Sequence, residues 1–213
     1  MFDKRTPLQK ADVFIWTGED ALRIWDRRRE EEKSIAFDTG WKVPYVPRFH
    51  VLWEEPKHYQ DALRKALGRG KKRILLAVPD DATFIERTAL EDFVCASLGR
   101  RLKKRGLTIC SHSVSLGKGQ YIAATRTCRC YCVALVKEGV VTSSQLLDAH
   151  RSERGALERE IYDFRDEAGE LGLKVYYPET EEDWTLMGLG KSISFAQMAT
   201  MDKPQKKSAE QKA

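Results

Sequence analysis

Short hydrophobic runs alternate with charged or turn-forming segments at the start of the chain and predict strands. The runs lie at positions 13–16, 22–25 and 35–37. A Thr17-Gly18-Glu19-Asp20 segment is typical of a turn, and the charged stretch 27–33 connects the second run to the third. We expect these runs to form three short strands in an antiparallel meander.

A helix and a buried strand follow. Pro56 can open a helix whose apolar residues share one face, and Gly68 can end it. The continuous apolar run 74–78 is typical of a central strand, which Pro79 stops. This part of the chain is therefore expected to pass from helix to strand.

A second helix and strand are predicted next. Asp80 or Asp81 is expected to cap the helix, because a short carboxylate can accept from free backbone N–H groups. Hydrophobic residues then recur at near-helical spacing until Gly106, and residues 107–110 predict a strand. The order so far is three strands, helix, strand, helix, strand.

The remaining pattern predicts a second meander and a long helix. After a turn at 117–119, strands are expected at 121–127, 131–136 and 140–143. A helix is expected from Leu147 through His150 to Leu171, where Gly172 ends it. Residues 173–177 are expected to form the last strand, and the stretch to Met201 is short and interrupted by glycine.

The element order favours an α/β protein of ribonuclease-H-like architecture, because a meander joined to βαβ units is the order of that fold. An alternative uses only residues 73–178, read as βαββαβ, and gives an α+β ferredoxin-like core. That alternative leaves the residues before position 73 without a role, so we prefer the two-meander interpretation.

Three segments resemble the bacterial actin-like rod-shape family of cytoskeletal ATPases. The first is Arg73-Ile-Leu-Leu-Ala-Val-Pro79, followed by Glu86-Arg87 and a helix to Gly99. The second joins residues 12–25 to Ser34-Ile-Ala-Phe-Asp-Thr-Gly40, and the third is the strand-turn-strand segment 120–141. The resemblance extends over residues 12–165 and implies an actin-type ATPase architecture of mixed sheets with helices, its second half truncated.

The resemblance implies four parts of the chain. Residues 1–116 would form a first actin-like subdomain and residues 117–178 a truncated second one. Residues 179–201 would form a C-terminal extension, and residues 202–213 a disordered basic tail.

The residues that hold ATP and magnesium in that family are replaced here. The family uses an Asp-x-Gly-Thr loop and an Asp-x-Gly-Gly-Gly-Thr loop, because glycine lets backbone N–H groups approach phosphate. Ile15 and Ala124 stand where the aspartates are expected, and Thr17 replaces the first-loop glycine. The second-loop glycines are replaced by Arg126, Thr127 and Cys128. The family's catalytic acid region is matched only by residues 111–117, which contain no acid. We therefore expect a pseudo-ATPase without a cofactor.

Composition fits a cytosolic protein. The 213 residues are 42% hydrophobic and 32% charged, with a formal net charge of +5. No stretch approaches the roughly 20 apolar residues of a membrane-spanning helix, so we expect no transmembrane segment and a cytoplasmic location. Cys128, Cys130 and Cys132 share one face of a predicted strand and are interpreted as structural, with metal binding or redox use as the alternatives.

Basic residues suggest an alternative function. Arg101, Lys103, Lys104 and Arg105 cluster before a predicted strand and could contact nucleic acid. Cations in the last turn of a helix are also favoured by the helix dipole, so the cluster has a structural explanation.

The leading hypothesis is a non-catalytic, actin-like assembly or scaffold protein of the rod-shape cytoskeletal kind. It would act in cell shape through protein partners, including a copy of itself. No catalytic, nucleotide-binding or metal-binding residue is assigned. The alternatives are a nucleic-acid-binding protein and an enzyme whose site carries no recognisable motif.

Overall fold

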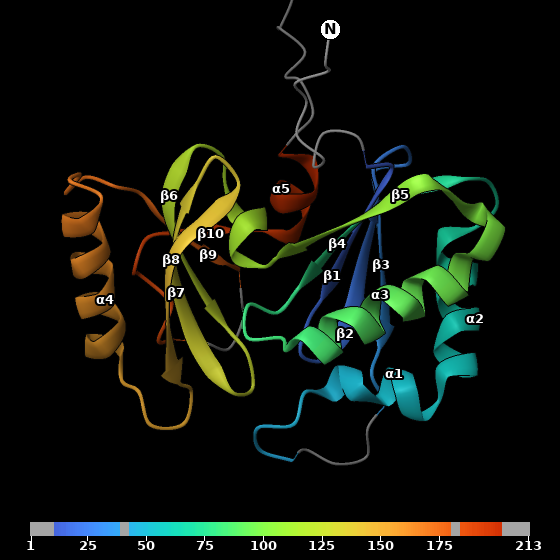
Figure 1. Cartoon of the computed structure of the whole chain (residues 1–213), viewed down its shortest axis with the longest axis horizontal. Coiled ribbons are helices and arrows are strands. Elements are labelled where there is room, and N and C mark those ends of the chain that lie inside the picture. The colour runs from blue at the N-terminus through green and yellow to red at the C-terminus, as the bar shows by residue number, and fades with distance from the viewer. Residues whose placement is uncertain (1–10, 39–42, 180–183, 202–213) are drawn as a thin grey trace, which may run out of the picture.

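Two five-stranded sheets lie next to each other, with helices on their outer faces (Figure 1). The computed structural model describes residues 11–38, 43–179 and 184–201, apart from the side chains of Lys104 and Arg105. Within these residues, no helix combines the length and apolar character needed to cross a membrane.

The first sheet has the strand order β3-β2-β1-β4-β5. It comprises β1 (Val13–Thr17), β2 (Ala21–Asp26), β3 (Glu31–Ala36), β4 (Lys72–Val78) and β5 (Leu102–Ser111). The first three strands pair antiparallel, and β1, β4 and β5 run parallel. The predicted meander and the strands after it are confirmed, although β3 begins inside the segment expected to be a charged connection.

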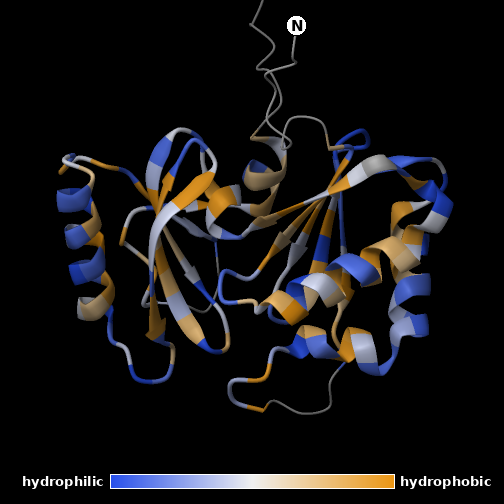
Figure 2. Ribbon diagram, viewed as in Figure 1, coloured by the Kyte–Doolittle hydropathy of each residue, from blue (hydrophilic) through white to orange (hydrophobic). Residues whose placement is uncertain are grey.

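In the described residues, the outer face of this sheet is covered by the helices α1 (Val51–Glu54), α2 (Pro56–Leu67) and α3 (Phe84–Leu98). A 3-10 turn, η2 (Arg48–His50), precedes α1, and another, η3 (Gly99–Arg101), follows α3. The α2 helix begins at Pro56 and ends before Gly68, as its pattern predicts. Hydrophobic residues line the strands and the inward helix faces, whereas the outward faces of α2 and α4 are hydrophilic (Figure 2).

The second sheet has the order β10-β9-β6-β7-β8. It comprises β6 (Gln120–Arg126), β7 (Cys130–Lys137), β8 (Val140–Asp148), β9 (Val175–Pro178) and β10 (Lys191–Ile193). Strands β6, β7 and β8 form an antiparallel meander, and β6, β9 and β10 run parallel. The helix α4 (Arg154–Glu167) packs on its outer face.

Both sheets follow the same plan. Each has a three-strand meander whose first strand is extended by two parallel strands, so β6 to β10 repeat the order of β1 to β5. The second half is reduced, because α3 connects β4 to β5 whereas no helix lies between β9 and β10 in the described residues. This duplicated plan contradicts the ferredoxin-like alternative, which requires β4 to β9 to share one sheet.

The inner faces of the two sheets share a core. Phe14 from β1 and Tyr121 from β6 belong to one hydrophobic cluster, which is completed by α5 (Phe195–Thr200). The ring of Phe195 stacks on Phe14 with a centroid distance of 5.5 Å. Figure 1 shows α5 between the sheets, where it closes one end of the interface. The 3-10 turn η4 (Ser113–Leu116) connects β5 to β6.

Two helices differ from the sequence predictions in their bounds. The α3 helix ends at Leu98, not Gly106, because Gly99 has a φ of 49° and its N–H bonds to the carbonyl of Cys95. Leu147 pairs with Tyr131 in the sheet, so the expected start of the long helix there is wrong and α4 begins at Arg154.

The C-terminal part of the chain also differs from expectation. The chain turns after α4 at Gly169, which has a φ of 66°, before reaching Gly172. The strand ending at Pro178 is not the last one, since β10 and α5 follow within the segment expected to be an extension. The predicted disordered tail at 202–213 lies outside the described residues.

Candidate functional site

The loop after β4 carries Asp80 and Asp81, whose side chains contact the second sheet, and it leads into α3. Thr83, not Asp80 or Asp81, caps the helix: its Oγ1 accepts from the N–H of Glu86 at 3.2 Å. In return the N–H of Thr83 donates to Oε2 of Glu86 at 2.8 Å. This reciprocal pair fixes the first turn of α3 and holds the Glu86 carboxylate at the end of the helix.

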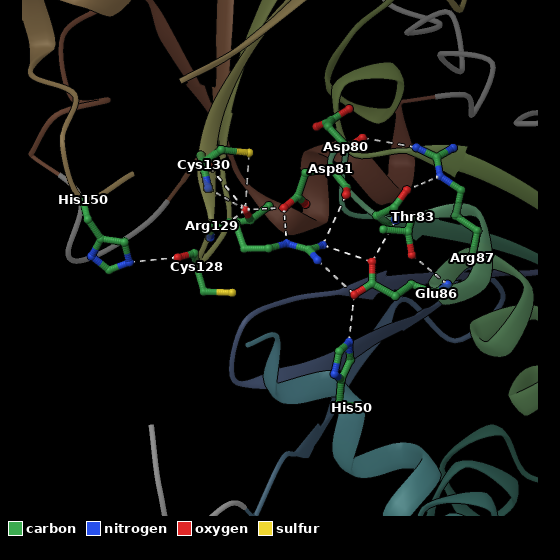
Figure 3. Close-up of polar contacts among 12 residues, drawn as sticks. His50, Asp80, Asp81, Thr83, Glu86, Arg87, Cys128, Arg129, Cys130 and His150 are labelled. Carbon is green, nitrogen blue, oxygen red and sulfur yellow. Dashed lines mark hydrogen bonds and ion pairs between the residues drawn. The ribbon is translucent and has the colours of Figure 1, made fainter. Parts of the chain in front are cut away.

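Arg129 reaches this loop from the turn between β6 and β7 (Figure 3). Its Nε donates to Oδ2 of Asp81 at 2.6 Å, and its Nη2 donates to the carbonyl oxygen of Asp81 at 3.2 Å. Its two terminal nitrogens also contact Glu86, at 3.0 Å and 3.1 Å. One guanidinium from the second sheet therefore binds two acids of the first.

His50 completes the cluster from the other side. Its Nε2 lies 2.8 Å from Oε1 of Glu86, the oxygen that also binds Nη1 of Arg129. His50 belongs to η2, so the Glu86 carboxylate joins η2, α3 and the β6–β7 turn. We call Arg129, Asp81, Glu86 and His50 the inter-sheet ion-pair cluster.

The electrostatics of the cluster favour the charged state. Burial raises the pKa of Glu86, but hydrogen bonds from Arg129, Thr83 and His50 outweigh it and lower the pKa to about 2. Burial likewise lowers the pKa of Arg129, yet its bonds to Glu86 and Asp81 raise it above the ordinary value. Glu86 is thus a carboxylate near neutral pH, bound by a permanent cation.

The β6–β7 turn is itself held in place. The Oγ1 of Thr127 donates to Oδ2 of Asp81 at 3.0 Å and accepts from the N–H groups of Arg129 and Cys130, at 3.2 Å and 3.1 Å. On the opposite side, Nε2 of His150 lies 3.1 Å from the carbonyl oxygen of Cys128. The Thr127 hydroxyl therefore occupies two backbone N–H groups that a phosphate loop would leave for its ligand.

Asp80 forms a second connection between the sheets. Its carboxylate accepts from the N–H of Ser113 at 3.2 Å and from Oγ1 of Thr125 at 2.6 Å. Ser113 lies on η4 and Thr125 on β6. Burial raises the pKa of Asp80 despite these hydrogen bonds. The loop after β4 therefore binds the second sheet through both of its acids.

The first hairpin, formed by β1 and β2, has a tight turn that is closed by its own backbone. The N–H of Gly18 bonds to the carbonyl of Ala21 at 3.0 Å, which makes a tight turn between β1 and β2. At the end of β1, the Trp16 ring stacks on His112 with a centroid distance of 3.6 Å and an interplanar angle of 7°. Burial lowers the pKa of His112 to about 3, so this ring is neutral near neutral pH.

The residues that the sequence places at the phosphate-loop positions do not face one another between the two sheets. Ile15 packs into the outer core of the first sheet and Ala124 into that of the second, so neither faces the other sheet. Trp16 and Thr125 stand at the inner side of these strands. Thr17 is buried at the end of β1, whereas Arg126 ends β6 with an exposed side chain. Neither inward position carries an acid.

Burial favours the protonated thiol form of the cysteines in and near β7 at neutral pH. Burial raises the pKa of Cys128 to about 11, and it does the same for Cys130. Burial also raises the pKa of Cys132 above its ordinary value. No group of three or more His, Cys, Asp or Glu residues suited to a metal ion occurs in the described part of the chain.

The predicted basic cluster is dispersed along η3 and β5. Arg101 donates from Nη1 to the carbonyl of Gly68 at 3.3 Å. The Nζ of Lys103 binds Oδ2 of Asp12 at 3.0 Å. Lys104 and Arg105 lie in β5, and their side chains are outside the described set. Internal contacts therefore occupy both described members, which weakens the nucleic-acid hypothesis.

Sequence reasoning missed the two residues of the cluster that bind Glu86, Arg129 and His50. The Thr83-x-x-Glu86 spacing is a capping-box signal and could have located the start of α3. No local signal pairs Arg129 with Glu86, because the two positions are 43 residues apart.

Comparison with solved structures identifies the fold. The AlfA filament bound to AMPPNP is similar at 9% identity, with a TM-score of 0.50 over 92% of each chain. MreB 5 of Spiroplasma citri bound to AMPPNP is similar at 14% identity, with a TM-score of 0.41, over 73% of this chain and 57% of that one. A Bacteroides thetaiotaomicron protein with an actin-like ATPase fold is similar at 9% identity, with a TM-score of 0.39, over 86% and 87%.

The chain has the actin-like ATPase fold. The AlfA match over nearly the whole of both chains agrees with the strand order shared by the two sheets, so the predicted fold class is confirmed. At such low identity the likeness shows the fold alone, and the chain spans less than two thirds of MreB 5. No protein-family model and no curated protein matches the sequence.

Proposed function

We propose that the chain is an actin-like assembly or scaffold protein that acts without ATP hydrolysis. It works through protein partners, including copies of itself, in a cytoskeletal role in the cytoplasm. Filament formation by the AlfA protein of the same fold supports assembly as the function. We also propose that the two subdomains meet at residue 116 and that the chain is related to the rod-shape proteins in particular.

The inter-sheet ion-pair cluster is the observation that carries this proposal. In the family that the sequence resembles, the second hairpin contacts phosphate through glycine N–H groups. Here the corresponding turn carries Arg129, whose charge is neutralised by Asp81 and Glu86. A cation already bound to two carboxylates is poorly available to a phosphate, because binding would break ion pairs that are largely shielded from water.

The first hairpin supports the same conclusion. Coordination of magnesium in such a site needs a carboxylate at the end of the strand. The inner side of β1 offers the indole of Trp16, stacked on the neutral ring of His112. Neither ring is a ligand for a hard cation that prefers oxygen. Internal contacts thus hold the two sheets together where a nucleotide and metal would otherwise do so.

Calorimetric titration of the full chain with Mg-ATP tests the loss of the nucleotide site. We expect no saturable heat up to millimolar concentrations and no phosphate release above a buffer control. A matched titration of Arg129→Gly examines whether the arginine alone blocks the site. Saturable binding of Mg-ATP by the unaltered chain would overturn the proposal.

A further inference from the structure

Strand β8 is an unprotected edge of the second sheet. It has nine residues and lies at the end of the strand order, with β7 as its neighbour. From Val140 to Leu147 the sequence Val-Val-Thr-Ser-Ser-Gln-Leu-Leu contains no charged residue. Natural sheets usually protect exposed edges with charges, because a bare edge pairs readily with another strand.

The other edge strands are protected in the usual ways. Strand β3 carries Glu31, Glu32 and Lys33, and β5 carries Lys103 and two further basic residues. Strand β10 has three residues and begins with a lysine. Strand β8 is therefore exceptional among the four edges of the described sheets. Its Val140 and Leu146 side chains are also 61% and 50% exposed.

A groove runs between β8 and β5, the facing edge of the first sheet. The groove has a volume of about 440 Å³ and is open to solvent on one side. Val140, Ser144 and Leu146 line it from β8, and Ile109 lines it from β5. Asp80 and Arg87 also line this groove. The groove thus combines apolar walls and two strand edges with one acidic and one basic residue.

Asp80 differs from the other acids that have shifted pKa values or inter-sheet contacts, because no cation among the described side chains forms an ion pair with its carboxylate. The cation-bound acids are Asp12 with Lys103, Asp26 with Lys72, and Asp81 and Glu86 with Arg129. The Asp80 carboxylate accepts hydrogen bonds from the neutral N–H of Ser113 and from the neutral hydroxyl of Thr125.

Arg87 lies on the same groove but does not neutralise this acid. Its Nε donates to the carbonyl of Ala82 at 3.0 Å, and its Nη2 donates to the backbone carbonyl of Asp80 at 3.3 Å. The guanidinium therefore holds the backbone of the loop. The raised pKa of Asp80, which burial causes, agrees with a carboxyl group that lacks a cationic partner.

We propose that an extended segment of a partner protein pairs with the β8 edge in this groove and places one lysine or arginine against the Asp80 carboxylate. Backbone hydrogen bonds to the strand edge would provide affinity. The ion pair with Asp80 would provide specificity, with apolar side chains packing on Val140 and Leu146. This inference goes beyond the proposed function, because it needs neither nucleotide nor filament formation.

A second copy of the chain fits the groove less well. Pairing β8 with another β8 would bring only neutral side chains from positions 140–147 and the acid Asp148. Each Asp80 would then remain without a cation. The occupant is therefore a segment of different sequence, with a basic residue between apolar ones.

Fluorescence anisotropy with synthetic peptides tests the proposal on the full chain. The probe peptide alternates valine with threonine and carries arginine in place of the central valine. Two companion peptides replace the arginine by citrulline, its neutral counterpart, or by glutamate. The protein variants are Asp80→Asn, which removes the charge, and Leu146→Lys, which places a cation on the groove side of β8. Gln145→Lys is the matched control at the exposed neighbouring position.

We expect saturable binding of the arginine peptide, with affinity about tenfold higher than for the citrulline peptide, because only arginine forms a hydrogen bond between two charged groups. Leu146→Lys should weaken binding and Gln145→Lys should not. Asp80→Asn should abolish the preference for arginine over citrulline. Leu146→Lys keeps the test valid if Asp80→Asn fails to fold.

Three results would overturn the proposal. The first is no saturable binding of any peptide, and the second is equal binding of arginine and citrulline peptides by the unaltered chain. The third is a dimer that Leu146→Lys dissociates, which would assign the β8 edge to a second copy. None of these depends on Mg-ATP, so failure here is distinguishable from failure of the proposed function.

Discussion

Arg129 binds Glu86 through both of its terminal nitrogens, with Nη1 to Oε1 at 3.0 Å and Nη2 to Oε2 at 3.1 Å. This geometry matches the planar fork of the guanidinium to the two carboxylate oxygens and is a strong form of ion pair. The arginine comes from the second sheet and the acid from the first. The pair therefore stabilises the arrangement of the two sheets as well as the local turn.

Removal of the arginine should destabilise the protein. Arg129→Met leaves the Asp81 and Glu86 carboxylates largely buried without their cation, and we expect a loss of about 2–4 kcal/mol in the free energy of unfolding. Urea denaturation followed by circular dichroism measures this loss. Arg28→Met is the control, since Arg28 binds Asp12 at 2.8 Å with a side chain that is 62% exposed.

The control substitution should cost less than about 1 kcal/mol, because exposed ion pairs are screened by water. Equal losses for Arg129→Met and Arg28→Met would contradict the structural role of the cluster.

Stability should fall in acid through Glu86. Its pKa lies at about 2 in the folded protein against an ordinary value of 4.5. A group whose pKa is lowered by folding stabilises the protein above its unfolded pKa and loses that contribution as the pH falls through the folded pKa. We expect Glu86→Gln to have a shallower loss of stability between about pH 5 and pH 2. Parallel pH profiles for the two proteins would contradict this expectation.

The capping box of α3 should contribute measurably to stability. Thr83→Ala removes the hydroxyl that accepts from the N–H of Glu86, and such changes cost about 1 kcal/mol. Thr88→Ala serves as the control, because its hydroxyl donates to the carbonyl of Phe84 within an exposed part of the same helix. Thermal unfolding should show a lower midpoint for Thr83→Ala than for Thr88→Ala.

The helix α5 should be required for the packing of the two sheets. Phe195 is 2% exposed and stacks on Phe14, so Phe195→Ala is expected to cost about 3–5 kcal/mol. Phe84→Ala is the matched control, since Phe84 is 83% exposed, and it should change stability by less than about 0.5 kcal/mol. Hydrogen exchange should show faster opening of β1 and β6 in Phe195→Ala. Unchanged exchange in both strands would contradict the role of α5.

Much of the fold could be predicted from the sequence because its signals are local. The apolar run that became β4 and the proline and glycine that bound α2 each act within a few residues. The same reasoning placed the end of α3 too late, because Leu102 continued the hydrophobic spacing past Gly99. Which glycine adopts a positive φ depends on the path of the following strand, and the sequence pattern does not contain that path.

The candidate site was less predictable, because it is built from distant positions. Arg129 and Asp81 are 48 residues apart, and His50 and Glu86 are 36 residues apart. Ile15 and Ala124 were identified by spacing, whereas the structure shows that the side chains facing the other sheet belong to Trp16 and Thr125. A shift by one residue along a strand selects a side chain on the opposite face of the sheet, because successive side chains point to alternate faces.

Sedimentation velocity across a concentration series, with and without Mg-ATP, tests the central claim most directly. The account predicts that the distribution of sizes depends on protein concentration and is the same with and without Mg-ATP, because internal ion pairs replace the nucleotide between the sheets. Assembly that appears or disappears on addition of Mg-ATP would contradict it, since the two hairpins would then still bind nucleotide.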